Sequence, residues 1–314
     1  MDVYRWDLDR TYLDTAIDSV RGLIRSALED ASAKRALPGA TALLRGLVEQ
    51  RPDSHVCILS GSPLQMRPVL EEKLVRDGIR FDRLILKDNL GNLRRGRLRA
   101  LRGQVGYKLP ALLLERMTMD ASACETLFGD DSEADALIYV AFAEVVAGRL
   151  DPTTLTRLLV RAGAYPDHVA SAVTTADALS ASGDVVDDIF IRLDKRTPPQ
   201  RFERLGPLVV PVHHWLQAAL VLWNRGKLGE THVADVASDA LAVGGARAIT
   251  GLVQDAVRRR LVEREAIQRL AEDQAMTDLR APIADALRWL PDLPKPLPRG
   301  EPPDLFGFLE QLHS

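Results

Sequence analysis

Short apolar runs alternate with longer amphipathic segments along the first two-thirds of the chain. The short runs, bounded by Gly, Pro, Asp or Ser, are typical of buried strands. They predict a strand from residue 3 up to the first aspartates and further strands at residues 55–59, 81–86, 123–128, 189–193 and 208–212. Helical spacing of apolar residues predicts helices at residues 13–28, 41–50, 64–77, 109–117, 134–147, 154–162, 167–179 and 215–223. This alternation predicts an α/β fold with a Rossmann-like, mostly parallel sheet and helices on both faces.

The C-terminal part of the chain has a different pattern. Residues 229–289 are helical throughout, residues 291–303 are Pro-rich and extended, and the apolar residues 305–309 are expected to dock on the body or on a partner. We therefore divide the chain into a sheet domain, residues 1–228, and a helical C-terminal extension with a Pro-rich tail, residues 229–314. A helical insert at about residues 150–185 interrupts the sheet domain. We expect it on the side opposite the strand ends, as a packing or interaction feature.

Composition narrows the class of protein. Of the 314 residues, 46% are hydrophobic and 27% charged, which is typical of a water-soluble globular protein. A net charge of -3 gives no global attraction to nucleic acid or to an anionic membrane. The charged N-terminal strand argues against a signal peptide, and two cysteines in apolar surroundings indicate reduced thiols. We expect a cytoplasmic protein with at most peripheral membrane contact.

Polar side chains follow three of the predicted strands. Asp7 and Asp9 end the first strand, Ser60 follows the second, and Asp130 with Asp135 follows the fourth. In a parallel sheet the carboxyl ends of neighbouring strands lie at one edge, where ligands bind. These side chains are therefore expected to meet in one site.

Carboxylates gathered in this way repel one another unless a cation holds them, and oxygen ligands suit a hard ion such as Mg²⁺. A lysine and hydroxyl groups in the same place would neutralise and hold a phosphoryl group. An aspartate can attack phosphorus to form an acyl-phosphate, and a second carboxyl can protonate the leaving oxygen and later activate water. The predicted chemistry is therefore phosphoryl transfer.

The arrangement resembles the haloacid dehalogenase (HAD) superfamily of phosphatases, which carry D-x-D-x-T/V, a Ser/Thr, a Lys/Arg and a paired acidic motif in this order. The matching residues here are Asp7-Leu8-Asp9-Arg10-Thr11, Ser60, Lys108, and Asp130 with Asp135. The short segment at residues 12–37 then corresponds to a small cap, which leaves the site open to a large or surface-bound substrate.

The resemblance implies a role for each of these residues. Asp7 would be the nucleophile and Asp9 the general acid and base. The phosphate would be held by Ser60, Gly61 and Lys108. Mg²⁺ would be bound by Asp7, the backbone carbonyl of Asp9 and Asp130, with Asp131 or Asp135 as a further ligand or a supporting carboxylate.

A narrower resemblance follows from longer stretches. PGATALLRGL, ILSGSPLQMRPVLEEKLVRDGI, YKLPALLLERM and LFGDDSEADALIY are similar to the catalytic domain of actin-patch-type phosphatidate phosphatases and their bacterial relatives. The similarity covers about residues 3–149, returns weakly at IFIRLDKRTP and LVVPVHHWLQAALVLWNRGKL, and does not cover residues 229–314. It implies a phosphorylated substrate, either phosphatidate and related lipid phosphates or a soluble phosphoester.

Three features depart from the family pattern. Arg10 stands where relatives usually carry an acidic residue, which would alter the charge beside the nucleophile. Asp131 adds a carboxylate to the acidic motif, although family spacing favours Asp135 as the partner of Asp130. The third departure is the helical insert.

Two other functions use the same fold. One is a non-catalytic interaction or scaffold module, with protein partners at the insert or the extension; the set of mutually repelling carboxylates argues against it. The other is phosphoryl transfer to an acceptor other than water. A basic run at residues 94–102 is either a solvated loop or a contact for an anionic substrate or lipid headgroups. His213 and His214 precede a helix and are expected to be cap or surface residues.

Overall fold

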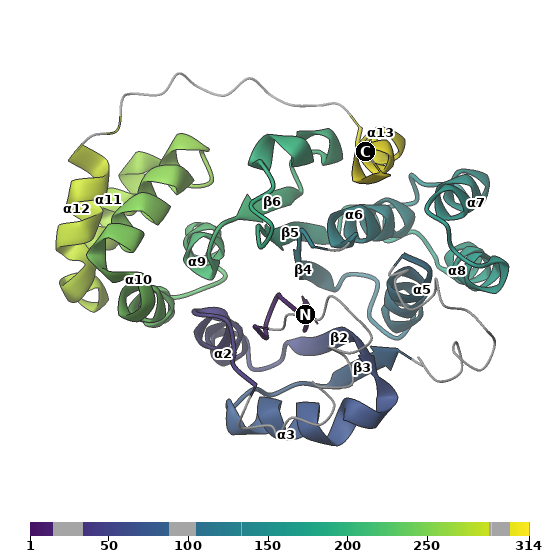
Figure 1. The fold of residues 1–314 in the computed structure, drawn as a ribbon, viewed down its shortest axis with the longest axis horizontal. Helices are drawn as coiled ribbons and strands as arrows, with labels where there is room; N and C mark the ends of the chain where they lie inside the picture. The colour runs from purple at the N-terminus through teal and green to yellow at the C-terminus, as the bar shows by residue number, and fades with distance from the viewer. Residues whose placement is uncertain (15–33, 88–104, 133, 289, 291–301, 314) are drawn as a thin grey trace.

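A six-stranded parallel sheet forms the centre of the computed structural model, in the order β3-β2-β1-β4-β5-β6 (Figure 1). The structure describes the chain apart from residues 15–33, 88–104, 133, 289, 291–301 and 314. The strands are β1 Asp2–Asp7, β2 His55–Pro63, β3 Arg83–Lys87, β4 Cys124–Asp130, β5 Val186–Arg192 and β6 Val209–Val212. The α/β prediction is confirmed. Pro211, which lacks an amide donor, lies in the edge strand β6 as its chemistry requires.

Helices cover both faces of the sheet (Figure 1). The apolar cluster on one face includes residues of α2 Ala40–Gln50, α3 Arg67–Arg76 and α9 Trp215–Asn224. The cluster on the other face includes residues of α5 Val105–Arg116, α6 Asp135–Val146, α7 Pro152–Arg161 and α8 Pro166–Ala178. Alternate residues of β1 point to opposite faces of the sheet. Tyr4 and Trp6 belong to the first cluster, while Arg5 lies over the ring of Phe142 of α6 on the face of the second cluster.

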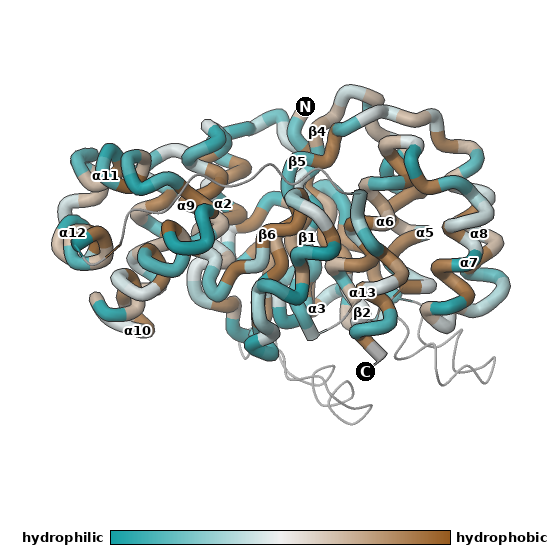
Figure 2. Tube along the Cα trace, turned by 90° about the horizontal axis from the view of Figure 1, so that it is seen from above, coloured by the Kyte–Doolittle hydropathy of each residue, from teal (hydrophilic) through white to brown (hydrophobic). Residues whose placement is uncertain are grey.

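The C-terminal helices continue the first apolar cluster. They are α10 Glu230–Arg258, α11 Arg264–Glu272 and α12 Arg280–Arg288, with η5 Gln274–Leu279 between the last two, and hydrophilic and hydrophobic stretches alternate along them (Figure 2). By length and composition alone, α10 is the one helix in the described part of the chain that could cross a membrane, which is weak evidence for a span. It is interrupted at Gly245, and its Val233, Val236 and Val253 are buried in the core.

The last helix, α13 Leu305–His313, returns to the sheet domain as predicted for its apolar residues. Phe308 packs against Phe202 of the 3-10 helix η4, Pro199–Leu205, with ring centroids 5.7 Å apart. Glu310 pairs with Arg161 of the insert at 2.6 Å. The extension therefore contacts both faces of the domain.

The insert lies elsewhere than expected. Helix α8 packs against α5, and α7 packs against α8. Ala164, in the turn between α7 and α8, lies beside Gly106 at the start of α5. A Cβ on Gly106 would lie only 2.7 Å from Nδ1 of His168, so α8 touches the start of α5 two residues before Lys108. The expectation that the insert lies wholly opposite the site is wrong, because the start of α8 lies beside the start of α5, which carries Lys108.

Two other boundaries differ from the prediction. Strand β2 runs on through Gly61 to Pro63, because a bulge between Ser60 and Pro63 keeps it paired with β3. Helix α5 begins at Val105, so Lys108 lies inside its first turn instead of opening it. Cys57 is buried and Cys124 only partly so, and both are free. The predicted cap helix, the basic run and most of the Pro-rich tail fall outside the described residues.

Candidate active site

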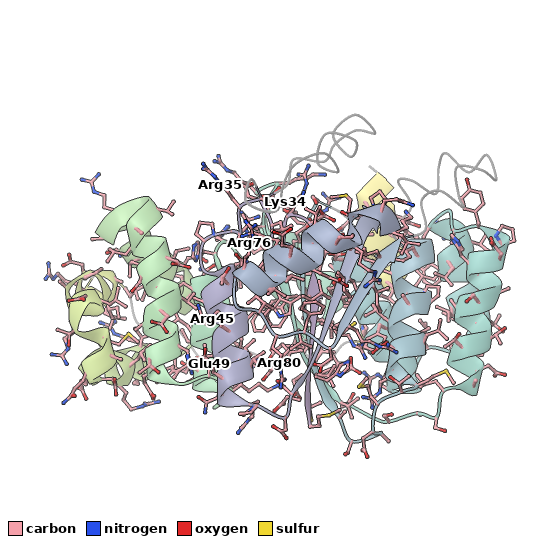
Figure 3. The ribbon with its side chains drawn as sticks, turned by 90° about the horizontal axis from the view of Figure 1, so that it is seen from below. Lys34, Arg35, Arg45, Glu49, Arg76 and Arg80 are labelled. Atoms are coloured by element: carbon pink, nitrogen blue, oxygen red, sulfur yellow. The ribbon has the colours of Figure 1, made fainter. Side chains whose placement is uncertain are left out.

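The predicted site residues meet at the edge where the strands end. Figure 3 shows the sheet from the side. Lys34 and Arg35 lie at the edge where the strands end, which holds the site, and Glu49 and Arg80 lie at the opposite edge. Asp7 closes β1, Ser60 lies near the end of β2 and Asp130 closes β4. All three are almost completely withdrawn from solvent.

Lys108 connects the carboxylates. Its Nζ lies 2.7 Å from Oδ1 of Asp7 and 2.5 Å from Oδ1 of Asp135, and all three side chains are buried. Lys108 reaches them because α5 packs on the sheet next to β1 and presents its first turn to the strand ends. The predicted meeting of this lysine with Asp7 is confirmed, and the lysine holds one oxygen of the predicted nucleophile in place.

Thr11 joins the first and fourth motifs. Its Oγ1 lies 3.1 Å from Oδ2 of Asp7 and 3.3 Å from Oδ2 of Asp130, so its single hydroxyl proton serves one of the two at a time. Trp215 of α9 donates its indole N–H to the carbonyl of Thr11 at 3.0 Å. The D-x-D-x-T motif contains Thr11, but spacing alone assigned it no role.

Three buried carboxylates could hold a metal ion. In the described part of the chain these are Asp7, Asp130 and Asp135, each with a ligand oxygen within 4.8 Å of the others. With Lys108 as the ammonium among them, the ionised group keeps an excess of two negative charges, which a divalent cation balances. An all-oxygen donor set fits Mg²⁺. Asp135 therefore lies with the carboxylates that could hold a metal ion and also binds Lys108.

Asp9 is separate from that group and points to β2. Ser60 donates its hydroxyl to Oδ2 of Asp9 at 2.7 Å, and Ser62 does so at 3.4 Å. The backbone N–H of Ser62 donates to Oγ of Ser60 at 3.0 Å across Gly61. The side chains of Asp7 and Asp9 thus have different neighbours, which matches the different roles predicted for them.

Tyr107 supports this part of the site. Its hydroxyl lies 3.1 Å from the carbonyl oxygens of both Ser60 and Ile85, and so bridges β2 and β3 next to the bulge. Burial raises the pKa of Tyr107 well above its ordinary value, so the group stays a donor. Sequence pattern does not single out this tyrosine, because its partners are backbone atoms of distant strands.

Gly129 permits the close approach of α6 to β4. A Cβ at this position would lie 2.7 Å from Oδ2 of Asp135 and 2.8 Å from the ring of Tyr139. A side chain here would displace the carboxylate that holds Lys108. The glycine is thus required by packing against a functional group.

Asp131 is not part of the carboxylate group. Its carboxylate accepts the backbone N–H groups of Lys195 at 2.8 Å and Thr197 at 3.1 Å. It therefore faces the turn after β5, whereas Asp135, the other supporting carboxylate predicted, lies in the group with Asp7 and Asp130. The reason is alternation: neighbouring residues at a strand end point to opposite sides.

Arg10 also points away from the nucleophile. Its Nη1 lies 3.1 Å from Oδ2 of Asp194, so its charge is balanced by a carboxylate after β5. Burial alone would raise the pKa of Asp194, but hydrogen bonds and charges from Arg192 and Arg10 outweigh burial and lower it. Arg10 has a left-handed backbone, with φ of 59°, which costs about 1–2 kcal/mol for a non-glycine residue.

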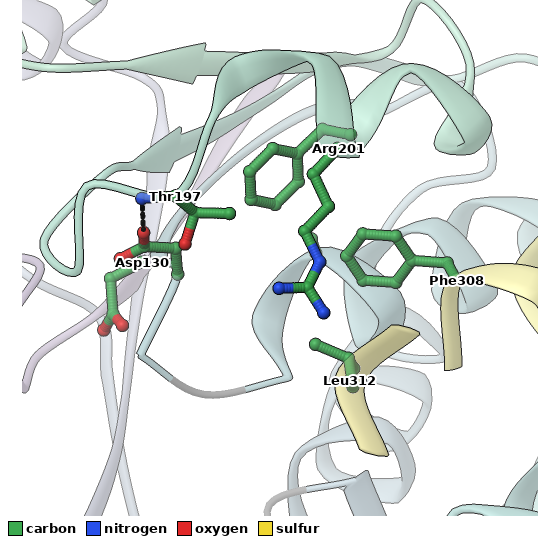
Figure 4. Close-up of a pocket in the computed structure, with 8 residues that line it drawn as sticks. Asp130, Thr197, Arg201, Phe308 and Leu312 are labelled. Atoms are coloured by element: carbon green, nitrogen blue, oxygen red, sulfur yellow. Dashed lines mark hydrogen bonds between the residues drawn. The ribbon is translucent and has the colours of Figure 1, made fainter. Parts of the chain in front are cut away.

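A small cavity lies beside the Asp130 turn (Figure 4). Its walls come from that turn, from the segment after β5 that contains Thr197, and from η4, α6 and α13, and they include Arg201, Phe308 and Leu312. Arg201 donates to the carbonyl of Gln311, so the C-terminal helix is fixed next to the site.

Comparison with known proteins supports the sequence resemblance. Residues 6–154 match the family described as "Phosphatidate phosphatase APP1, catalytic domain". The match includes every candidate catalytic residue, whereas β5, β6, the C-terminal helices and most of the insert lie outside it. No curated protein and no solved structure gives a significant match. This part of the chain thus resembles the catalytic domain of these phosphatases.

Proposed function

We propose that this protein is a Mg²⁺-dependent phosphatase that hydrolyses a phosphate monoester through an aspartyl-phosphate intermediate on Asp7. One observation carries the proposal: Lys108 binds Asp7 and Asp135 in a buried group of three carboxylates whose oxygens lie close enough to hold a metal ion. The match of residues 6–154 to a phosphatase catalytic domain supports it.

Asp7, Asp130 and Asp135 would hold Mg²⁺, together with the carbonyl of Asp9. When bound, the ion would neutralise charge on the phosphoryl oxygens of the substrate. Lys108 supplies a second positive charge from the protein itself. Thr11 fixes the second oxygen of Asp7, so that the carboxylate keeps one orientation for attack.

The first chemical step uses Asp7 and Asp9. A carboxylate oxygen of Asp7 attacks phosphorus, the bond from phosphorus to the ester oxygen breaks, and the leaving oxygen takes a proton from Asp9. The alcohol departs, and the phosphoryl group stays on Asp7 as an acyl-phosphate. Ser60 donates its hydroxyl to Asp9 in the structure, and with substrate bound it would donate to a phosphoryl oxygen.

The second step returns the enzyme to its starting state. Asp9, now ionised, takes a proton from water, and the water oxygen attacks phosphorus. The bond between phosphorus and Asp7 breaks, inorganic phosphate leaves, and Asp9 keeps the proton for the next cycle. Atoms balance, because one water is consumed for each ester hydrolysed.

The substrate class follows from the family match. Phosphatidate or a related lipid phosphate is the proposed substrate, in line with the name of the matching family. The cytoplasmic side of a membrane is the place where a protein with at most peripheral membrane contact would meet it.

The test is release of inorganic phosphate from a generic aryl phosphate and from phosphatidate in detergent, with Mg²⁺ and with EDTA. We expect Mg²⁺-dependent release that Asp7→Asn abolishes, while Asp184→Asn at the opposite edge of the sheet leaves it unchanged. Full activity of Asp7→Asn would disprove the assigned nucleophile. A wild-type chain that is inactive on lipid, sugar, nucleotide and peptide phosphates would favour the scaffold function.

A further inference from the structure

The turn after β5, residues 193–197, contacts the turns that carry the two halves of the proposed chemistry. One is the Asp9 turn, residues 8–11, and the other is the Asp130 turn, residues 130–132. The turn after β5 lies outside the family match, which ends at residue 154. Its contacts also explain the two single-residue departures from the family pattern, Arg10 and Asp131.

Two arginines and one aspartate join the turn after β5 to the Asp9 turn. Arg192 donates through one nitrogen, Nη1, to Oδ1 of Asp194 at 2.7 Å and to the carbonyl of Arg10 at 3.1 Å. Arg10 donates to the other oxygen of Asp194 at 3.1 Å. Both the backbone and the side chain of Arg10 are therefore held, and the left-handed backbone of Arg10 is kept in place by this network.

Asp131 joins the same turn to the Asp130 turn. Its two carboxylate oxygens accept the N–H groups of Lys195 and Thr197, and the second bond is drawn in Figure 4. Lys195 also donates through Nζ to the carbonyl of Ser132 at 3.0 Å. The N–H of Asp131 donates to the carbonyl of Arg192 at 3.0 Å. The two connections thus meet at Arg192 and the residues directly after it.

We infer that Asp194 and Asp131 are positioning residues that set the spacing between the Asp9 turn and the Asp130 turn. This inference rests on the proposed function, in which Asp9 and Asp130 act on one phosphoryl group from two separate turns. A displacement of about 1 Å between such groups can cost two orders of magnitude in rate. We call the set Arg10, Asp131, Arg192 and Asp194 the clamp.

The clamp makes a specific prediction about Arg10. A left-handed backbone favours glycine, so Arg10→Gly relieves strain and keeps the fold while it removes the bond to Asp194. A merely structural contact would affect thermal stability and leave the rate unchanged. A positioning contact lowers kcat with stability retained.

The experiment compares Arg10→Gly, Asp194→Asn and the double variant with wild type on a generic aryl phosphate. Each single variant should lower kcat about tenfold, with KM changed by less than about twofold, because Ser60 and Lys108 still bind the phosphate. The kcat of the double variant should be no lower than that of the less active single variant, because both substitutions remove the same bond between Arg10 and Asp194. Asp184→Asn, which breaks an exposed pair with Arg149, is the matched control and should behave as wild type.

Amide hydrogen exchange gives a readout that does not depend on activity. In Asp194→Asn, exchange should accelerate in residues 8–13 as well as in 193–197, because the two turns lose their connection. An unchanged kcat, additive effects in the double variant, or faster exchange confined to the substituted turn would each overturn the clamp. A wild-type chain without phosphatase activity would overturn the proposed function instead, and exchange alone would then decide whether the turns are coupled.

Discussion

Replacing Asp130 by Asn should stabilise the metal-free protein. Asp130 lies with Asp7 and Asp135, with ligand oxygens within 4.8 Å, and one ammonium, that of Lys108, lies among them. At an effective dielectric constant of about 20, two like charges at this separation repel by about 3.5 kcal/mol. Asp130 has two such neighbours, and attraction to Lys108 offsets roughly one of them.

The substitution also weakens hydrogen bonds. Asp130 accepts from Thr11 at 3.3 Å and from the N–H of Ser132 at 2.5 Å, and a neutral amide accepts less strongly, at a cost of about 1–2 kcal/mol. The net result is a gain of about 1.5–2.5 kcal/mol in the free energy of unfolding in EDTA. That corresponds to a rise in Tm of roughly 3 °C for a chain of this size.

Mg²⁺ should reverse the order. At about 100 times its Kd, a bound ion stabilises wild type by about 2.7 kcal/mol, whereas the variant lacks a ligand and gains little. Thermal and urea unfolding in EDTA and in Mg²⁺ measure both effects, and the control Asp184→Asn, in an exposed pair with Arg149, should keep the Mg²⁺ response. A variant less stable than wild type in EDTA, or one with the full response to Mg²⁺, would refute the reasoning.

Three other substitutions test separate parts of the structure. Lys108→Met leaves the buried carboxylates Asp7 and Asp135 without their ammonium. Urea titrations in EDTA should show a free energy of unfolding about 3–5 kcal/mol lower than that of wild type. Phosphate release in the presence of Mg²⁺ should fall at least about 100-fold. Gly129→Ala should displace Asp135 and lower kcat about tenfold in the same assay. Burial lowers the pKa of His214 from 6.5 to about 4, and its neutral ring caps α9, so stability is full above pH 6.5 and falls towards pH 4. Protonation of His214 should therefore lower the free energy of unfolding by about 2 kcal/mol between pH 7 and pH 5. Urea titrations should show this loss in wild type and not in His214→Asn.

Local pattern was enough to predict the strands and which of them end in polar groups. Parallel topology then required Asp7, Ser60 and Asp130 to meet at one edge, and they do. Lys108 was identified by motif order, and its contacts with Asp7 and Asp135 agree. The cap position of His214 was also predicted and is confirmed.

Contacts between distant segments were beyond the reach of the pattern. Arg10 finds its partner Asp194 184 residues away, and spacing carries no information about such a pair. The direction of Asp131 depends on where the turn after β5 lies, which the family motif does not include. The bulge in β2 needs the pairing with β3, and the role of Tyr107 needs both strands.

Trapping the phosphorylated enzyme tests the central claim most directly. The protein would be mixed with an aryl phosphate and Mg²⁺, quenched in acid within its turnover time, digested and examined by mass spectrometry. We expect one phosphoryl group on the peptide that contains Asp7. It should be absent in Asp7→Asn and should accumulate in Asp9→Asn, which lacks the base for the second step. Turnover without a phosphorylated Asp7 peptide, together with activity retained by Asp7→Asn, would contradict it.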